Sequence, residues 1–543
     1  MTYGSRHRRA HWPAHDADLD GALDAMTADE LRAFVREALE RLDLEPRGEL
    51  LDSLIARASK SSSGWKPSSP SRGVVGEVTR FVEAARRIGY AQPHDVDDYL
   101  RKGTKAFLAG EHATSREVFE ALLPTIGYGD VDLGQHELVD EVLTVDLREC
   151  AAQYVAAVYL TTPLEDRAEA LCRTIERLQG IASLWEPLEQ MERVVTGPIP
   201  ELDAFLTRWV KHLERQPPSE SEWDDDRDRW LREAVSRLEG VAGLERIARK
   251  TRKPEALRAW CEALTRRGEW AKALGAWDDA TKLAGKSYWR GEFLDGAALA
   301  ARQLGRRDAS RRLEAAWRGA PSLVRLLRWL GAGTPSASTV IKRAKRATGH
   351  LPGKAARQLG LLHLLTGDSH AAAKILAKAR GLGWSDEDHP GHVLFPAFVG
   401  LLAEGTETEL GVELFAYLRD TPSGPSDTDL EDDDGVKPRL VAPSVAELIA
   451  HVRLGAKIDV MDRVAMLEAM QAAAKRRVDG ILGKKRRRHY GHAAMLVVCC
   501  LKLGPVIGRQ EVIAKWVAEL RQRYSRFHAF QREVDHALAE VSS

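Results

Sequence analysis

Apolar residues recur every three or four positions along most of this chain, which is the spacing of one face of an α-helix. The first such run follows Thr27, whose side chain can cap a helix, and Glu30 three positions later completes a capping box. A second run over 47–58 predicts a partner helix. The N-terminal part therefore predicts a helical hairpin, preceded by a polar, flexible arm over 1–18.

The segment 98–124 has the order of small and large residues of a tetratricopeptide-type (TPR-like) hairpin. Gly103 lets two helices cross closely, and Gly110 is placed to end the first helix. Phe107 and Phe119 are large enough to fill the gap to the next hairpin. This segment therefore predicts one unit of a helical-repeat protein.

The same order returns at 260–280, 299–316 and 359–379, and the last copy is the clearest. The copies lie about 35–60 residues apart, which is too uneven for a regular array. No Asn-Gly or Asp-Gly hairpin separates two β-like segments, and Ala, Leu, Arg and Glu, all good helix formers, dominate. The fold class predicted is all-α, an irregular TPR-like helical-repeat solenoid with a separate C-terminal helical domain.

Three stretches have the Pro, Gly, Ser or acidic composition of linkers, namely 59–72, 216–228 and 421–438. They divide the chain into an N-terminal arm and hairpin (1–58), a helical domain (73–215), TPR-like repeats (229–420) and a C-terminal helical domain (439–543). In the C-terminal helical domain, Ser444 is expected to cap a first helix. Apolar spacing predicts further helices over about 459–479, 486–503 and 509–539.

Charge is balanced over the whole chain but not along it. Lys+Arg and Asp+Glu both number 80, which argues against a surface tuned as a whole to nucleic acid or anionic membrane. Over 436–543, however, 20 Lys and Arg residues face 10 Asp and Glu residues. The C-terminal part is therefore basic.

The sharpest local signal is a basic run. It consists of Lys484, Lys485, Arg486, Arg487 and Arg488. Arg476 and Arg477 lie shortly before it, and Tyr490, with His489, could add stacking on a ligand. Five cations at a helix start oppose the helix dipole, and an anionic partner would relieve this. The run could equally be a solvated surface, or form an internal contact with the acidic residues at 428–434.

Other candidate chemistry is weak. His489 and His492 with Cys499 and Cys500 are zinc-type ligands, but one helix spreads them too far along its axis to close a site, so core thiols are favoured. His136-Glu137 lacks the second His of a zinc-protease helix. Tryptophans such as Trp260 and Trp277 at repeat spacing are typical of inter-repeat core.

No phosphate-binding loop, dinucleotide fingerprint or nucleophile elbow occurs, so we expect neither an enzyme nor a cofactor or metal. The chain has five cysteines, an odd number that cannot all pair in disulfides, and no Cys-x-x-Cys motif. This favours free thiols in a reducing cytoplasm. The N-terminus lacks the apolar core of a signal peptide, and the most apolar stretch, 493–503, is too short to span a membrane. A soluble cytoplasmic protein is predicted.

Two stretches resemble known proteins. The first runs from Gly367 to Gly391 and includes Trp384; the second is Arg487–Ala494 (Arg-Arg-His-Tyr-Gly-His-Ala-Ala), followed by Trp516–Val534. Both resemble uncharacterised bacterial helical-repeat proteins, and the C-terminal one is similar to the helical tails that accompany SWIM zinc fingers. The finger's Cys-x-Cys and Cys-x-His ligands are missing from the sequence, so the resemblance implies helices and no metal role.

The sequence supports three hypotheses on function. The first is a protein-interaction scaffold, because stacked hairpins present surfaces that bind proteins through many modest contacts. The second is a nucleic-acid-associated factor that acts through the 484–488 run. The third is a protease substrate or regulatory protein, cleaved in the 421–438 linker to release an effector piece. None of the three involves a membrane.

Overall fold

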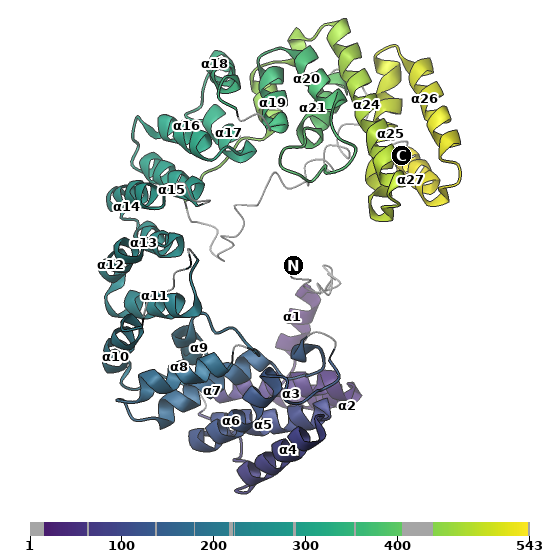
Figure 1. Cartoon of the computed structure of the whole chain (residues 1–543). Helices are drawn as coiled ribbons and strands as arrows, with labels where there is room; N and C mark the ends of the chain where they lie inside the picture. Colours follow the sequence, from purple (N-terminus) through teal and green to yellow (C-terminus); the bar gives the residue numbers. More distant parts are fainter. Residues whose placement is uncertain are drawn as a thin grey trace. The chain divides into compact units, whose positions relative to one another are not determined.

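The computed structural model of the chain describes residues 16–61, 64–135, 138–178, 180–216, 221, 223–285, 289–351, 355–403 and 438–540 (Figure 1). The chain forms two compact units, one ending at Ile247 and the other beginning at Ala248. In the described residues, α-helices dominate and the β-structure consists of an isolated bridge between Tyr90 and Asp132. The predicted all-α helical-repeat fold is therefore confirmed. Residues 421–437 of the predicted linker 421–438, in which the suggested cleavage would fall, lie outside the described residues.

The first unit consists of short helices that pack mainly on their neighbours in the chain. They are α1 (Asp16–Ala25), α2 (Ala28–Arg41), α3 (Leu44–Lys60), α4 (Val74–Ile88), α5 (Pro93–Ala109), α6 (His112–Gly127), α7 (Leu147–Thr161), α8 (Arg167–Arg177), α9 (Pro187–Val194), α10 (Leu202–Glu214), α11 (Asp226–Leu238) and most of α12 (Gly240–Thr251). The capping box of Thr27 and Glu30 is present at the start of α2, as predicted.

The second unit continues this pattern. Its helices are α13 (Pro254–Arg266), α14 (Trp270–Leu283), α15 (Arg290–Gln303), α16 (Ala309–Gly319), α17 (Leu323–Leu330), α18 (Ala337–Thr348), α19 (Ala356–Leu365), α20 (Ser369–Ala377), α21 (Gly391–Ala403), α23 (Val445–His451), α24 (Val460–Gly483), α25 (Tyr490–Val506), α26 (Gln510–Arg523) and α27 (His528–Glu540). One predicted helix, 509–539, is two, because the chain turns between Tyr524 and Phe527 and α26 and α27 both pack on α25.

The turns of the predicted hairpins contain glycine in the left-handed backbone region. Gly110, Gly268, Gly305 and Gly367 have φ values of 89°, 69°, 63° and 85°. A side chain at such a φ meets the neighbouring backbone, so glycine is favoured there. Each of these four turns joins a pair of helices that pack together: α5 and α6, α13 and α14, α15 and α16, and α19 and α20. The predicted hairpins are confirmed at all four places.

Other glycines let helices touch. A Cβ atom on Gly103 would lie 2.8 Å from the ring of Phe119, and one on Gly296 would lie 2.4 Å from the ring of Trp277. Both aromatic rings are buried. The large residue of one helix therefore occupies the place where the next helix has no side chain.

Tryptophans fill much of the second unit's core. Trp260, Trp277, Trp317 and Trp329 are buried, and the rings of the last two stack with centroids 5.2 Å apart. Trp270 and Trp289 are half-buried. The prediction that these tryptophans are inter-repeat core is confirmed for the buried four.

Ion pairs link one hairpin to the next along the second unit. Arg249 of α12 pairs with Asp279 of α14 at 3.0 Å. Asp278 of α14 accepts two hydrogen bonds, of 2.7 and 3.1 Å, from Arg312 of α16. Such partly exposed pairs contribute about 0–1 kcal/mol each, so apolar burial supplies most of the stability and the pairs help to set the register.

Two of the predicted domain boundaries do not separate hydrophobic cores. The helices on either side of 216–228, α10 and α11, pack together, and Trp209 stacks on Trp230 at 6.3 Å. The last residues of that stretch already belong to α11. A segment of linker composition buries little apolar surface of its own. The helices before and after it can nevertheless pack on each other.

The C-terminal residues also differ from the prediction of a separate domain. One continuous apolar core runs from Ala298 to Ala537, and α24 packs on both α20 and α21. His370 of α20 contacts Asp462 of α24 at 2.9 Å between Nδ1 and Oδ1. The C-terminal helices therefore extend the second unit.

Close glycine contacts can be tested by paired substitutions in neighbouring helices. Gly296→Ala in α15 should lower the free energy of unfolding of the second unit by about 1–3 kcal/mol, because its Cβ would overlap the Trp277 ring. Gly275→Ala in α14 should raise it by up to about 1 kcal/mol, because nothing lies within 4 Å and alanine favours helix. Urea unfolding followed by circular dichroism measures both. Equal effects of the two substitutions would contradict the close-packing explanation.

Candidate functional site

The basic run forms an exposed turn between two long helices. Lys484, Lys485, Arg486, Arg487 and Arg488 are all exposed, and within the described part of the chain none of them forms an ion pair with a carboxylate. We call residues 484–488 the basic turn. Other exposed arginines of this protein, such as Arg246 with Glu214 and Glu239, do have acidic partners. Unpaired adjacent cations therefore distinguish this turn.

The backbone of the basic turn is strained at one lysine. Lys485 has a φ of 53°, in the left-handed region. The Lys485 N–H donates to the carbonyl of Leu482, and the Arg486 N–H donates to the carbonyl of Ile481, which is the hydrogen-bond pattern of a helix C-terminus that normally ends on glycine. A non-glycine residue costs about 1–2 kcal/mol in that conformation. A lysine therefore occupies a position where glycine would be more stable.

The position of the run corrects the dipole argument made from the sequence. We expected the cations to begin the next helix, but α24 ends at Gly483 and α25 begins only at Tyr490. Lys484 and Lys485 therefore lie at the C-terminal end of α24, where the helix dipole favours cations. The dipole alone does not require an anionic partner at this turn.

Arg476 and Arg477 bind the protein's own backbone rather than extending the exposed turn. Arg476 donates from Nη1 to the carbonyls of Ala377 and Ala379, the latter at 3.3 Å, at the end of α20. Arg477 is buried and donates to the carbonyl of Gly381 at 3.3 Å. Both arginines therefore fasten α24 to the segment that follows α20.

Tyr490 is also part of the interior. Its side chain is 4% exposed, and its ring packs edge-on against Phe530 of α27 with centroids 6.0 Å apart. It therefore cannot stack on a base or another ligand. Of the eight candidate residues, the five at 484–488 remain accessible as one group.

The two stretches that resemble other proteins meet in a buried aromatic cluster. Trp384, which is 2% exposed, has the ring of His389 at 5.0 Å and that of His492 at 5.0 Å, with His392 at 6.1 Å. The guanidinium carbon of Arg477 lies 5.7 Å from the Trp384 ring. These residues come from the loop after α20, from α21, α24 and α25. Nothing in the sequence pattern predicted this cluster, although Trp384, His389 and His392 lie close together in the chain.

Hydrogen bonds fix the neutral state of one histidine in this cluster. His389 Nε2 lies 2.8 Å from the carbonyl of Arg380, and its Nδ1 lies 3.0 Å from the N–H of Gly391. Nε2 must therefore donate and Nδ1 must accept, which is possible only for the neutral ring. Burial lowers the pKa of His389, and nearby arginines add to this effect.

The other two histidines resist protonation more strongly. Burial, with the charge of Arg357, lowers the pKa of His392 to about 4. Burial, with the charge of Arg477, lowers the pKa of His492 to about 3. A positive charge on either ring would lie in an apolar site beside cations. The cluster is therefore suited to packing α24 and α25 against the loop after α20 while all three rings are neutral.

No metal centre is formed within the described ranges, where no group of three His, Cys, Asp or Glu residues is arranged to hold an ion. Cys499 and Cys500 are buried free thiols, and burial raises the pKa of both. His136 and Glu137 lie outside the described residues. In the described helices, none combines the length and the apolar character needed to cross a membrane.

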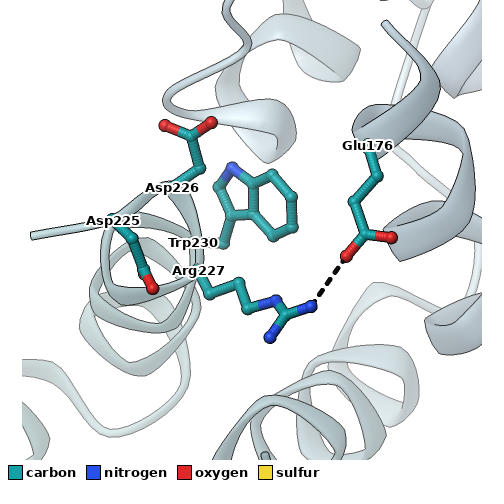
Figure 2. Close-up of a pocket in the computed structure, with 5 residues that line it drawn as sticks. All are labelled: Glu176, Asp225, Asp226, Arg227 and Trp230. Atoms are coloured by element: carbon teal, nitrogen blue, oxygen red, sulfur yellow. Dashed lines mark hydrogen bonds and ion pairs between the residues drawn. The ribbon is translucent and has the colours of Figure 1, made fainter. Parts of the chain in front are cut away.

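A hollow of about 600 Å³ lies in the first unit, where the start of α11 faces α8 (Figure 2). Arg227 and Glu176 point toward each other across it and form an ion pair of 2.9 Å. Asp225 is occupied as the helix cap of α11, and Trp230 is 1% exposed with its indole N–H donated to the carbonyl of Leu184. The polar groups at the hollow are thus engaged with the protein itself.

Sequence reasoning also missed an uncovered apolar surface on the N-terminal hairpin. Phe34 in α2 and Leu54 in α3 are 56% and 47% exposed. The apolar spacing that predicted these helices was visible, but the spacing alone does not show whether another helix covers the apolar face.

No protein-family model matches the chain, and no curated protein matches it in sequence. Among solved structures, the chain is similar to a circular tandem repeat protein with novel repeat topology and enhanced subunit contact surfaces. The two chains are 16% identical, and the match covers 92% of this chain and 98% of that chain with a TM-score of 0.19. A TM-score this low supports no inference about fold or function. The fold assignment follows from the helices and contacts described above.

The neutral histidines predict a dependence of stability on acid. Below the unfolded pKa of about 6.5, the unfolded chain takes up protons that folded His392 and His492 do not. The free energy of unfolding should therefore fall as the pH drops from 6.5 toward 4, by at most about 1.4 kcal/mol per pH unit for each histidine. Denaturant unfolding at pH 7.5, 6, 5 and 4.5 measures this.

The variant His392→Gln/His492→Gln should show a smaller loss of stability between pH 6.5 and 4.5 than the wild type. His528→Gln, which changes an exposed histidine of the same unit, serves as the control. The explanation fails if the double variant and the wild type lose the same free energy over this range.

Proposed function

We propose that this protein is a non-enzymatic scaffold of helical hairpins that holds an acidic segment of a partner protein at its basic turn. The observation that carries the proposal is the exposed group Lys484–Arg488, five adjacent cations without an acidic partner in the described part of the chain. The whole protein has a formal net charge of zero, so the remaining chain carries the five net negative charges that balance this turn. A flexible acidic peptide can bring several carboxylates to such a turn.

The strain at Lys485 supports a binding role for this turn. Residues in sparsely populated backbone regions cluster at functional sites, where the side chain is needed despite its cost. Glycine would relieve the left-handed φ of 53° but would remove one of the five cations.

A protein partner is favoured over nucleic acid by what surrounds the turn. Single-stranded nucleic acid is usually bound by a basic groove together with aromatic rings on which bases stack. Tyr490 is buried, and Arg476 and Arg477 are engaged with backbone carbonyls. The accessible cations thus form one short turn, which suits a local acidic motif. Helical-repeat proteins commonly bind other proteins, which agrees with this choice.

We also propose a cytoplasmic location. All five cysteines are buried free thiols, which is usual for proteins in a reducing compartment.

Binding by the basic turn can be tested with all five residues changed to Ser. A fluorescent peptide of twelve Asp and Glu residues and a twelve-nucleotide single strand serve as probes, and affinity capture from host-cell lysate, with and without nuclease, seeks natural partners. The variant should bind the peptide at least about tenfold more weakly, because it loses five charge-assisted contacts. Wild type should capture proteins that survive nuclease treatment, and the variant should lose them.

The matched control changes five dispersed, exposed lysines of the same unit to Ser, namely Lys250, Lys342, Lys345, Lys374 and Lys378. It removes the same net charge and should keep most of the binding. Equal loss in both variants would show a general charge effect and contradict the proposal. Preferential binding of the nucleotide strand, with captured partners lost on nuclease treatment, would favour a nucleic-acid factor instead.

The strained lysine gives a second, independent prediction. Lys485→Gly should raise the free energy of unfolding by up to about 1 kcal/mol, because glycine accepts a positive φ, while weakening binding of the acidic peptide. Lys485→Gln should weaken binding without raising stability. If Lys485→Gly changes stability alone, the side chain has no part in binding.

A further inference from the structure

The N-terminal hairpin carries an apolar surface that no described residue covers. We call it the α2–α3 surface; its large side chains are each 36–56% exposed and are Phe34, Val35, Leu42, Leu50, Leu51 and Leu54. In α2, no residue is buried. By contrast, α5 of the next hairpin buries Leu100 and Phe107 completely or nearly so. The α2–α3 hairpin is therefore the least covered of the hairpins that the sequence predicted.

The attachment of the hairpin to the rest of the unit includes polar contacts: Arg101 of α5 donates to Asp52 of α3 at 2.9 Å, and Lys60 lies 4.0 Å from Glu149. The apolar residues of the α2–α3 surface are thus left for another contact.

We propose that this surface binds the same surface of a second copy of the chain, so that two α2–α3 hairpins form a four-helix bundle. Two antiparallel hairpins that bury their apolar faces against each other make a common stable arrangement. The contact is isologous, so one surface supplies both sides and a closed dimer results. It is independent of the basic turn, which lies in the other unit.

The exposed apolar area of the α2–α3 surface is close to the apolar area that each partner buries in a stable dimer. Six half-exposed apolar side chains leave roughly 500 Å² of apolar surface in water, in the upper part of the range for the largest patch on a typical monomer. A stable interface buries about 800 Å² on each partner, of which somewhat more than half is apolar. The α2–α3 surface supplies this apolar share, and the polar residues around it supply the remainder.

The acidic first turn and the helix dipole of α2 favour an antiparallel arrangement of the two copies. Helix α2 has Asp29 and Glu30 in its first turn, and Glu40 and Arg41 in its last. If two α2 helices pack antiparallel, the acidic first turn of each lies beside Arg41 of the other, and their helix dipoles oppose. The ion pairs within each helix, Asp29 with Arg32 and Glu37 with Arg41, are exposed and weak enough to rearrange. A parallel arrangement would bring like charges together.

Sedimentation of the full chain from about 1 to 100 μM tests the association. The wild type should approach twice 60.2 kDa as its concentration rises. Phe34→Asp/Leu54→Asp should raise the dissociation constant at least about 100-fold, because it places charge at the centre of the apolar contact. The control Ile88→Asp changes a residue that is 74% exposed outside this surface and should leave the dissociation constant unchanged.

A cysteine placed at the centre of α2 tests the geometry and replaces only one of the six apolar side chains of the surface. Val35 lies at the middle of α2, so antiparallel pairing brings it close to Val35 of the second copy. Val35→Cys should form a disulfide-linked dimer under mild oxidation, whereas Ile88→Cys should not. The five native thiols are buried and do not compete.

A wild type that stays at 60.2 kDa up to about 100 μM overturns the proposal, as does a dimer that survives Phe34→Asp/Leu54→Asp with its helix content intact. A monomer whose hairpin variants lose a protein captured from lysate would assign the surface to a different partner and would equally overturn self-association. Loss of acidic-peptide binding in the basic-turn variant tests the function proposed above and leaves this result unaffected.

Discussion

Each helical hairpin of this protein has apolar residues that stay in water until a neighbouring hairpin covers them. Two short helices bury too little surface to be stable alone, so the stack is held by contacts between successive pairs. The glycines at close crossings allow these contacts: the Trp277 ring lies where a side chain of residue 296 would be. The same requirement explains why α24 to α27 join the core of the second unit rather than forming one of their own.

Polar groups refine this apolar stack at the ends of its helices. Arg343 donates to three carbonyls at the end of α17, those of Trp329, Leu330 and Ala332, at 2.9–3.0 Å. Arg476 does the same at the end of α20. Unpaired carbonyls at a helix end are strong acceptors, and a cation there also meets the negative end of the dipole. Arginines that look like surface charge in the sequence therefore join helices that pack together, whether consecutive, as for Arg343, or distant in the chain, as for Arg476.

This second role of arginine separates the basic residues near the C-terminus into two kinds. Lys484–Arg488 remain in solvent because α24 has ended and α25 has not begun, so no neighbouring helix covers them. Arg477 lies only two helical turns earlier but points into the interior beside Trp384. The available surface for an acidic partner is thus narrower than the charge of the whole C-terminal part suggests. An interaction there would be local, whereas association through the α2–α3 surface would be apolar and would involve the other unit.

The sequence by itself determined the helical class, the hairpin turns and the presence of a basic run, because these depend on local properties. Apolar spacing sets a helix, and a glycine such as Gly367 is needed wherever φ is positive. Only the tertiary structure decided which faces are covered. It placed Tyr490 in the core, joined Trp384 to His492 across more than one hundred residues, and left Phe34 in water. Periodicity gives the direction in which a side chain points but not what lies there, since burial depends on helices that are distant in sequence.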